Sequence, residues 1–212
     1  MKLLIGVPAL DYMHADFVKC LTALIFKLKK DGVNFDLEIA TGTLVYFARD
    51  RIARKAINEG YTHVLWLDAD MVFNPDVVDD LLFPDKPFVC GVFHARRPSY
   101  GSCIFKCIDL IQGVSRYEEY PADTFEIAGC GFACVLIETE ILKAVCTHYG
   151  TCFTPIINYG EDLAFCKRVT ELGYKMYCEP SVRVGHIGHK VIWPEDHEKW
   201  KAEISNYEEV TK

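Results

Sequence analysis

The 212-residue sequence predicts a single α/β domain, with a central, mostly parallel sheet flanked by helices and a more mixed second half. Strand-like and helix-like segments alternate regularly through the first third of the chain. The apolar run at residues 64–67 ends in two acids, Asp68 and Asp70, as expected for a buried strand that reaches a ligand crevice. The chain is long enough to bury one sizeable core, and it contains no internal repeat.

The alternation in the first third can be followed element by element. Residues 3–9 form an apolar run that predicts a strand. Residues 14–30 carry apolar side chains at helical spacing and predict a helix that stops at an Asp-Gly pair. A second strand at residues 35–40, a second helix at residues 44–58 and a third strand at residues 64–67 follow. This order implies a parallel sheet with right-handed crossovers.

The second half of the sequence predicts shorter elements in a less regular order. The expected strands are residues 87–93, 103–108, 125–137, 175–178 and 182–184, and the expected helices are residues 141–146 and 160–173. We divide the predicted domain into a nucleotide-binding half at residues 1–93 and an acceptor or sugar half at residues 94–194. Residues 195–212 are a polar tail that could lead to a further domain.

The bulk properties restrict the function. The formal net charge is -7, which argues against a nucleic-acid-binding surface. No apolar stretch approaches the roughly 18 residues of a transmembrane helix. The apolar N-terminus breaks at Pro8, and we interpret it as a first core strand, not as a signal peptide.

Ten cysteines are many for a chain of this size, but they lack the paired spacing of a zinc site. Several, including Cys20, Cys90, Cys134 and Cys166, lie in apolar context and are typical of small core residues. We therefore expect reduced thiols and a cytoplasmic location, which would be the host cytoplasm for a viral protein. The alternative is a secreted protein with a disulfide framework, although a chain of this size does not need one for stability.

Asp68 and Asp70 are the first candidates for a functional site. Carboxylates at the end of a buried strand are costly unless a cation meets them, and a divalent metal with oxygen ligands would do so. Residues i and i+2 of a strand lie about 7 Å apart, so we expect Asp70 to bind the ion directly and Asp68 to act through water or on hydroxyl groups. The alternative is that both acids cap the next turn.

Glu161 and Asp162 are the second candidates. They follow Gly160 at the predicted start of a helix, where free N–H groups and the helix dipole stabilise anions. Acids are common there for that reason alone, but the same field keeps a carboxylate ionised, as a general base requires.

Histidines and arginines are the remaining candidates. His186 and His189 flank a glycine-rich turn, and imidazole suits manganese or zinc. The alternative is that both are solvated, as a pair of histidines in a loop more often is, so their metal role depends on Asp70. Arg49 lies near the start of the second predicted helix and could face the crevice, and Arg96 follows a strand end. Arginine is well suited to phosphate and carboxylate groups.

Three segments together resemble nucleotide-sugar glycosyltransferases of the GT-A fold. They are residues 47–71, which contain Asp68-Ala69-Asp70, residues 127–132, which contain Gly131, and residues 160–166. The resemblance extends from Leu3 to about Gly188, and the combination is most similar to glycosyltransferase domains encoded by large algal viruses.

The resemblance implies a role for each matching residue. Asp68-Ala69-Asp70 would be the Asp-x-Asp motif that binds Mn²⁺ or Mg²⁺ on the donor diphosphate, and His186 would complete the metal shell. Asp162, with Glu161, would lie at the acceptor site. The residues expected at the nucleotide or its phosphates are Pro8, Ala9, Leu10, Thr41, Arg49, Asp50, Asp68, Ala69, Arg96, Gly131 and Lys190. Many relatives carry asparagine where this chain has Asp50.

The predicted activity is therefore metal-dependent transfer of a sugar from a UDP-sugar, by default UDP-glucose or a related hexose, to a glycan or other hydroxyl acceptor. A haloacid-dehalogenase-type phosphatase is one alternative, with Asp68 as nucleophile and Asp70 as acid. That motif normally follows the first strand, whereas two strand–helix units precede it here. The other alternative is a non-catalytic nucleotide-sugar-binding module.

Overall fold

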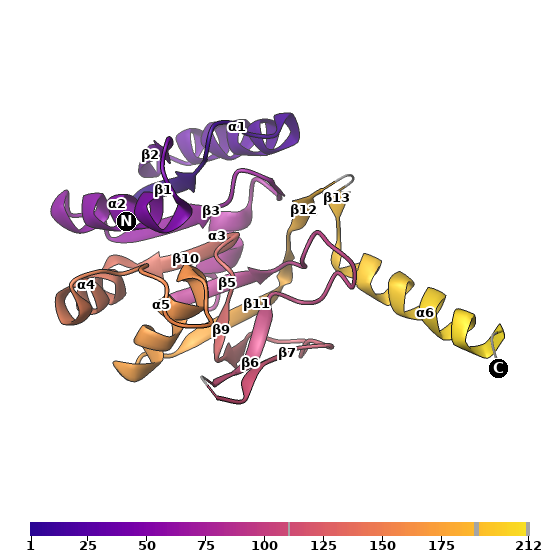
Figure 1. The fold of residues 1–212 in the computed structure, drawn as a ribbon. Coiled ribbons are helices and arrows are strands. Elements are labelled where there is room, and N and C mark those ends of the chain that lie inside the picture. Colours follow the sequence, from indigo (N-terminus) through magenta and orange to yellow (C-terminus); the bar gives the residue numbers. More distant parts are fainter. Residues whose placement is uncertain (110, 189–190, 211–212) are drawn as a thin grey trace.

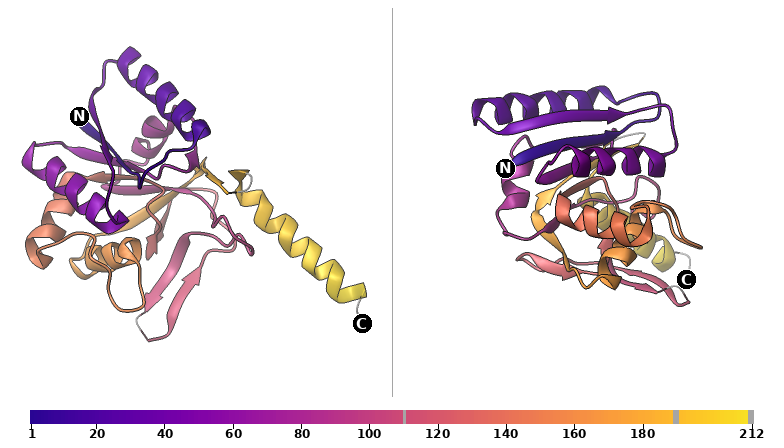
Figure 2. Two further views of the ribbon diagram at one scale, coloured as in Figure 1. Left: turned by 45° about the horizontal axis from the view of Figure 1, so that its top comes forward. Right: turned by 90° about the vertical axis from the view of Figure 1, so that its left-hand side faces the viewer.

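The computed structural model describes residues 1–109, 111–188 and 191–210, with the side chains of the last helix described through Ile204. A central sheet is covered by helices on both faces, and the C-terminal helix extends away from this body (Figures 1 and 2). None of the described helices is long and apolar enough to cross a membrane.

The first half contains the elements β1 (Lys2–Pro8), α1 (Ala15–Lys30), β2 (Asn34–Ala40), α2 (Val45–Asn58), β3 (His63–Leu67), β4 (Met71–Val72), α3 (Val77–Leu82) and β5 (Phe88–Val92). The second half contains β6 (Ile104–Asp109), β7 (Gly113–Arg116), β8 (Phe125–Ile127), β9 (Gly129–Cys130), β10 (Cys134–Glu138), α4 (Thr139–Tyr149), α5 (Glu161–Glu171), β11 (Met176–Arg183), β12 (Gly185–Ile187), β13 (Val191–Ile192) and α6 (Pro194–Val210).

The central sheet has seven strands in the order β2-β1-β3-β10-β5-β11-β8. β1 is parallel to β2 and β3, and β5 is parallel to β11. β10 is antiparallel to both β3 and β5, and β8 is antiparallel to β11, so the other five strands all point the same way. The predicted mostly parallel sheet is confirmed, as is its mixed second half.

The two faces of the sheet bury separate sets of side chains because successive strand residues point to opposite sides. Leu4, Val64 and Trp66 pack with α2, α4 and α5 on one face. Leu3 and Leu65 pack with α1 and α3 on the other. The helices in Figure 1 lie on these two faces, which gives three layers.

Some predicted boundaries differ from the structure. The expected strands at residues 175–178 and 182–184 are one strand, β11, and the expected strand at residues 125–137 is three short ones. Residues 195–210 of the polar tail belong to α6, which begins at Pro194.

The small sheet β13-β12-β4 positions one candidate residue. β12 is antiparallel to β4 and pairs His186 with Met71, the residue after Asp70. His186 is therefore part of a strand, whereas the sequence predicted a turn. Because β4 continues from the end of β3, this pairing places His186 at the carboxyl edge of the central sheet.

Candidate active site

A cavity of about 840 Å³ lies at the carboxyl edge of the parallel strands, where ligands bind in open α/β sheets. Twelve of the predicted site residues line it. They are Pro8, Ala9, Leu10, Arg49, Asp68, Ala69, Asp70, Arg96, Gly131, Glu161, Asp162 and His186. The structure thus brings segments from the whole length of the chain around one space.

The backbone of the Asp68-Ala69-Asp70 segment is held by three different parts of the chain. The Asp68 N–H donates to the carbonyl of Ala133 at 3.2 Å, before β10. The Ala69 carbonyl accepts from the N–H of His14 at 3.2 Å, and the Asp70 carbonyl accepts from that of Ile187 at 2.8 Å. These bonds fix the segment in place, so both carboxylates start from a rigid backbone.

The Asp68 carboxylate turns toward α2. Its Oδ1 accepts from Arg49 Nη2 at 2.8 Å, and Arg49 is only 3% exposed. Burial raises the pKa of Asp68 to about 6, with the nearby Asp70 charge acting in the same direction and Arg49 opposing them. Arg49 is therefore the main group that favours the ionised form of Asp68, with a smaller contribution from His186.

The Asp70 carboxylate turns the other way. Its Oδ2 lies 2.6 Å from Arg96 Nη1 and 3.3 Å from His186 Nε2. Burial works against ionisation of Asp70, but the hydrogen bond and charge of His186, together with Arg96, lower the pKa of Asp70 below its usual value. The two acids of the motif are thus in different environments.

His186 is oriented by the carbonyl of His94, which lies 2.9 Å from His186 Nδ1. A carbonyl only accepts, so Nδ1 carries a hydrogen and Nε2 faces Asp70. Burial would lower the pKa of His186, but the hydrogen bond and charge of Asp70 raise it. This orientation is the one in which metal-binding histidines present Nε2 to an ion.

The donor set suits a hard divalent cation. Asp70 and His186 meet directly, and a site of two protein ligands plus diphosphate oxygens and water is ordinary for Mg²⁺-type ions. Asp68 is directed to Arg49, and among the described residues no three acidic, histidine or cysteine side chains converge closely enough to hold a metal. The residues fit an ion that a phosphorylated ligand helps to bind.

The first turn of α5 forms the wall beside Arg49. Glu161 Oε1 lies 3.5 Å from Arg49 Nε, and Asp162 Oδ1 accepts from the N–H of Leu163 at 2.7 Å. Burial raises the pKa of Asp162, and the charge of Glu161 adds to this effect while Arg49 opposes it. A carboxylate with a raised pKa is a better proton acceptor than an ordinary one.

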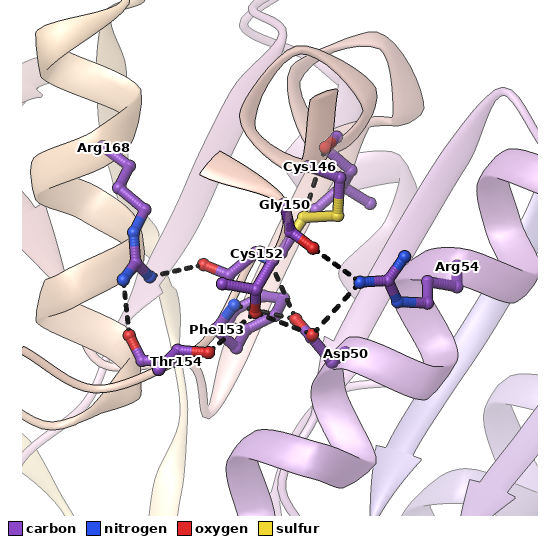
Figure 3. Close-up of a disulfide and its surroundings, with 10 residues drawn as sticks. Asp50, Arg54, Cys146, Gly150, Cys152, Phe153, Thr154 and Arg168 are labelled. Atoms are coloured by element: carbon purple, nitrogen blue, oxygen red, sulfur yellow. Dashed lines mark hydrogen bonds and ion pairs between the residues drawn. A yellow bond between two sulfur atoms is a disulfide. The ribbon is translucent and has the colours of Figure 1, made fainter. Parts of the chain in front are cut away.

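Asp50 lies away from the cavity, although it adjoins Arg49 in α2. Consecutive helix residues point in different directions, and Asp50 faces the loop after α4. Its carboxylate accepts from the backbone N–H groups of Cys152 and Phe153, both at 2.9 Å, and from Thr151 Oγ1 at 2.7 Å (Figure 3). A contact of Asp50 with nucleotide stays a prediction.

Thr41, Lys190 and His189 complete the predicted set. Thr41 is exposed and does not line the cavity, whereas Thr43 does, after a turn at Gly42. Lys190 and His189 fall outside the described residues.

The expectation that all ten cysteines are reduced is wrong for Cys146 and Cys152, which form a disulfide (Figure 3). Gly150 ends α4 in the left-handed region and turns the chain back, so the two Cα atoms lie 4.9 Å apart, within the range that a disulfide spans. Arg54 donates to the Gly150 carbonyl, and Arg168 donates to those of Cys152 and Thr154.

Sequence reasoning missed other residues that line the cavity. They include Tyr12, His14, Thr43, Cys103 and Arg116. Tyr12 and His14 lie in the loop after β1. In this region the sequence predicted ligand contacts only for residues 8–10. Arg116 lies on β7, a strand that the sequence did not predict, so nothing indicated that its side chain would reach the site.

Neither a protein-family model nor a curated protein matches the sequence. Solved structures do match. The protein A197 from STIV, which is viral, has a TM-score of 0.66 at 18% identity over 92% of each chain. The catalytic domain of Drosophila beta1,4galactosyltransferase 7, in complex with xylobiose, has a TM-score of 0.53 at 14% identity, over 85% of this chain and 66% of that one.

GalNAc-T7, in a structure with UDP, GalNAc and Mn²⁺, has a TM-score of 0.52 at 13% identity. The match covers 89% of this chain but only 44% of that one. Together these likenesses show that the chain has the GT-A fold, which confirms the fold expected from the sequence.

Proposed function

We propose that this chain is a divalent-metal-dependent glycosyltransferase that moves a sugar from a UDP-sugar to a hydroxyl group of a glycan or similar acceptor. One observation carries the proposal. Two pairs of acids, Asp68 with Asp70 and Glu161 with Asp162, line the same cavity at the carboxyl edge of a GT-A sheet. One pair suits a metal and diphosphate, and the other suits a hydroxyl acceptor.

The donor would lie across the ends of β1 and β3. Pro8, Ala9 and Leu10 line the cavity at the end of β1 and offer an apolar surface to uridine. Asp70 and His186 would hold Mn²⁺ or Mg²⁺, which when bound neutralises the charge of a leaving diphosphate. GalNAc-T7 has the same fold and was solved with UDP, GalNAc and Mn²⁺, which supports this class of donor.

The chemistry needs one proton acceptor and one stabilised leaving group. The bond between the sugar C1 and the phosphate oxygen breaks, and the acceptor oxygen forms the new bond to C1. In an inverting reaction Asp162 takes the acceptor proton, which its raised pKa favours. In a retaining reaction the leaving phosphate oxygen takes that proton, and Asp162 positions the sugar.

Residues 1–93 would form the nucleotide-binding half and residues 94–194 the acceptor half, with α6 beyond them. Both parts line the cavity: the first contributes Arg49, Asp68 and Asp70, and the second contributes Asp162 and His186. A cytoplasmic location stays in the proposal because the other eight cysteines are free thiols, although the Cys146–Cys152 disulfide is not typical of that compartment.

A nucleotide-release panel tests the activity. The protein is incubated with nucleotide sugars and Mn²⁺, with and without simple sugar acceptors, and free nucleotide is measured. Acceptor-stimulated release of UDP from at least one donor supports the proposal. Rapid phosphate release from generic phosphate esters with Mg²⁺ would instead support the phosphatase alternative. Metal-dependent UDP binding without turnover would support a binding module.

Asp70→Ala tests the site itself. We expect it to abolish Mn²⁺-dependent UDP binding in calorimetry while the circular dichroism spectrum stays unchanged, because Asp70 lines a cavity and does not pack in the core. The matched control is Asp123→Ala, which removes an exposed carboxylate outside the cavity lining. Unchanged UDP affinity in the Asp70 variant would contradict the assignment.

A further inference from the structure

A guanidinium already lies where a metal would bind Asp70. Arg96 Nη1 is 2.6 Å from Asp70 Oδ2, the same oxygen that faces His186 Nε2 at 3.3 Å. The side chain of Asp70 is 21% exposed and that of Arg96 is 50% exposed. Arg96 therefore reaches Asp70 from the open side of the cavity, and its guanidinium can move away while Asp70 keeps His186 as a partner.

Hydrogen bonds to backbone carbonyls hold the loop that carries Arg96 in place. His94 is 2% exposed, and its Nδ1 lies 2.6 Å from the carbonyl of Tyr100. His197, on α6, is 5% exposed, and its Nδ1 lies 2.8 Å from the carbonyl of Ser99. The Ala95 N–H also donates to the Gly101 carbonyl at 2.9 Å, which closes the loop on itself.

Because its backbone is held and its side chain is half-exposed, Arg96 can change its side-chain conformation without movement of the loop. The loop holds the Cα of Arg96 beside Asp70, and only the side-chain torsions need to change for the guanidinium to move. Its other natural partner in a donor complex is a phosphate, because the arginine fork matches phosphate oxygens.

We propose that Arg96 and the metal ion exchange at Asp70, and that the donor diphosphate accepts Arg96 when the ion displaces it. This inference rests on the proposed function and adds a coupling to it. Two cations cannot share Oδ2 without repulsion, so Arg96 weakens binding of the ion to the free protein. The diphosphate removes that penalty, so metal and nucleotide bind cooperatively through Arg96 in addition to their direct contact.

Manganese titrations test the exchange without any turnover. Free Mn²⁺ is measured by electron paramagnetic resonance, with and without UDP, for the wild type, Arg96→Gln, Arg96→Lys and Arg97→Gln. Arg97 is exposed and does not line the cavity, so its variant removes the same charge from the neighbouring position. Arg96→Lys keeps a cation on the same loop.

For Arg96→Gln we expect Mn²⁺ alone to bind about fivefold more tightly, the equivalent of an ion pair worth about 1 kcal/mol. The ratio of Mn²⁺ dissociation constants without and with UDP should fall by a similar factor. Arg97→Gln should match the wild type, and Arg96→Lys should lie nearer the wild type than Arg96→Gln does.

The outcomes separate the two proposals. If the wild type binds Mn²⁺ with UDP and Arg96→Gln changes neither affinity nor ratio, the exchange is wrong and the glycosyltransferase proposal stands. If neither the wild type nor Arg96→Gln binds Mn²⁺, with or without UDP, both the exchange and the metal-dependent function are overturned.

Discussion

Arg49 Nη2 lies 2.8 Å from Asp68 Oδ1, and this buried guanidinium also approaches Glu161. One side chain of α2 thus connects the acid at the end of β3 with the first turn of α5. Its guanidinium carbon lies over the ring of Phe132, 5.2 Å from the ring centroid. Arg49 therefore supplies a positive charge beneath the cavity and links the end of β3 to the start of α5.

Arg49→Met should lower the free energy of unfolding by about 2–3 kcal/mol, measured by urea denaturation. Methionine keeps an unbranched apolar side chain of similar length at this position but leaves Asp68 and Glu161 without their cation. Breaking a fully buried pair costs about 3–5 kcal/mol, and the value expected here is smaller because Asp68 keeps 30% exposure. Arg51→Met, at a 53% exposed position of the same helix, should cost less than about 0.5 kcal/mol. Equal costs would refute the role of Arg49.

The predictable part of the fold is the part that local patterns determine. The stripe of Phe17, Leu21 and Leu24 and the apolar runs of β1, β3 and β5 depend on neighbouring residues, and these elements appeared within one or two residues of prediction. The insertion of antiparallel β10 between β3 and β5 depends on pairing across the chain. A run such as residues 134–137 is buried whichever strands flank it, so the sequence could not determine its place.

The same distinction holds for the site. The unequal environments of Asp68 and Asp70 follow from strand geometry and could be expected. The direction of Asp50 could not, because it depends on where the loop after α4 returns. The disulfide had the same origin, since the turn at Gly150 brings Cys146 near Cys152. Cys146 and Cys152 had no spacing that distinguished them from the buried thiols.

Asp162→Asn should lose transfer activity while keeping Mn²⁺-dependent UDP binding. The amide keeps the shape of the side chain but cannot take the proton from the hydroxyl group of the sugar acceptor at neutral pH. A general base typically contributes 10²- to 10⁴-fold, so we expect a fall in kcat of about 100-fold or more. The comparison is Glu161→Gln, which should affect kcat less because Glu161 is placed to interact with Arg49. Normal turnover in Asp162→Asn would remove it from the catalytic residues.

The pH profile of kcat should show an acid limb above the ordinary aspartate pKa of 3.8, because burial raises the pKa of Asp162. A base must be ionised, so activity is lost as the pH falls through this raised value. Glu161→Gln removes a negative charge that also raises the pKa of Asp162, so the limb should move to lower pH. Profiles at saturating donor and Mn²⁺ check this. A limb that moves to higher pH would contradict the assigned coupling.

Asp50→Ala should destabilise the fold by about 2–3 kcal/mol, since it leaves the N–H groups of Cys152 and Phe153 without their charged acceptor. Urea denaturation of the wild type and the variant, each under oxidising conditions, measures this cost. Asp50→Asn keeps one acceptor oxygen and should cost less. UDP affinity of the Asn variant separates the two roles, because a loss would indicate that Asp50 also contacts nucleotide. A cost near zero for Asp50→Ala would mean that the disulfide alone holds the loop.

Gly131→Ala should disturb both the Asp162 side and the His186 side of the cavity. A Cβ at Gly131 would stand 2.8 Å from Phe93 Cζ and 3.6 Å from Asp162 Oδ2, so Phe93 must shift. Phe93 packs edge-on against His186, with ring centroids 6.4 Å apart, so the shift would be passed to the proposed metal side as well. Overpacking of this kind costs about 1–3 kcal/mol of stability.

Misplacing reacting groups by about 1 Å can cost about 100-fold in rate, so kcat should fall more in Gly131→Ala than the loss of stability alone explains. Activity is measured at a temperature where the variant is fully folded by circular dichroism, and Mn²⁺ affinity is measured alongside. Gly101→Ala is the matched control. A Cβ there would meet its nearest neighbour, Arg116 Nη1, at 3.4 Å, so the Arg116 side chain would need to move very little. If the Gly131 variant kept wild-type kcat and Mn²⁺ affinity, the Phe93 ring would not couple the two walls, and the proximity of Gly131 to Asp162 would have no bearing on catalysis.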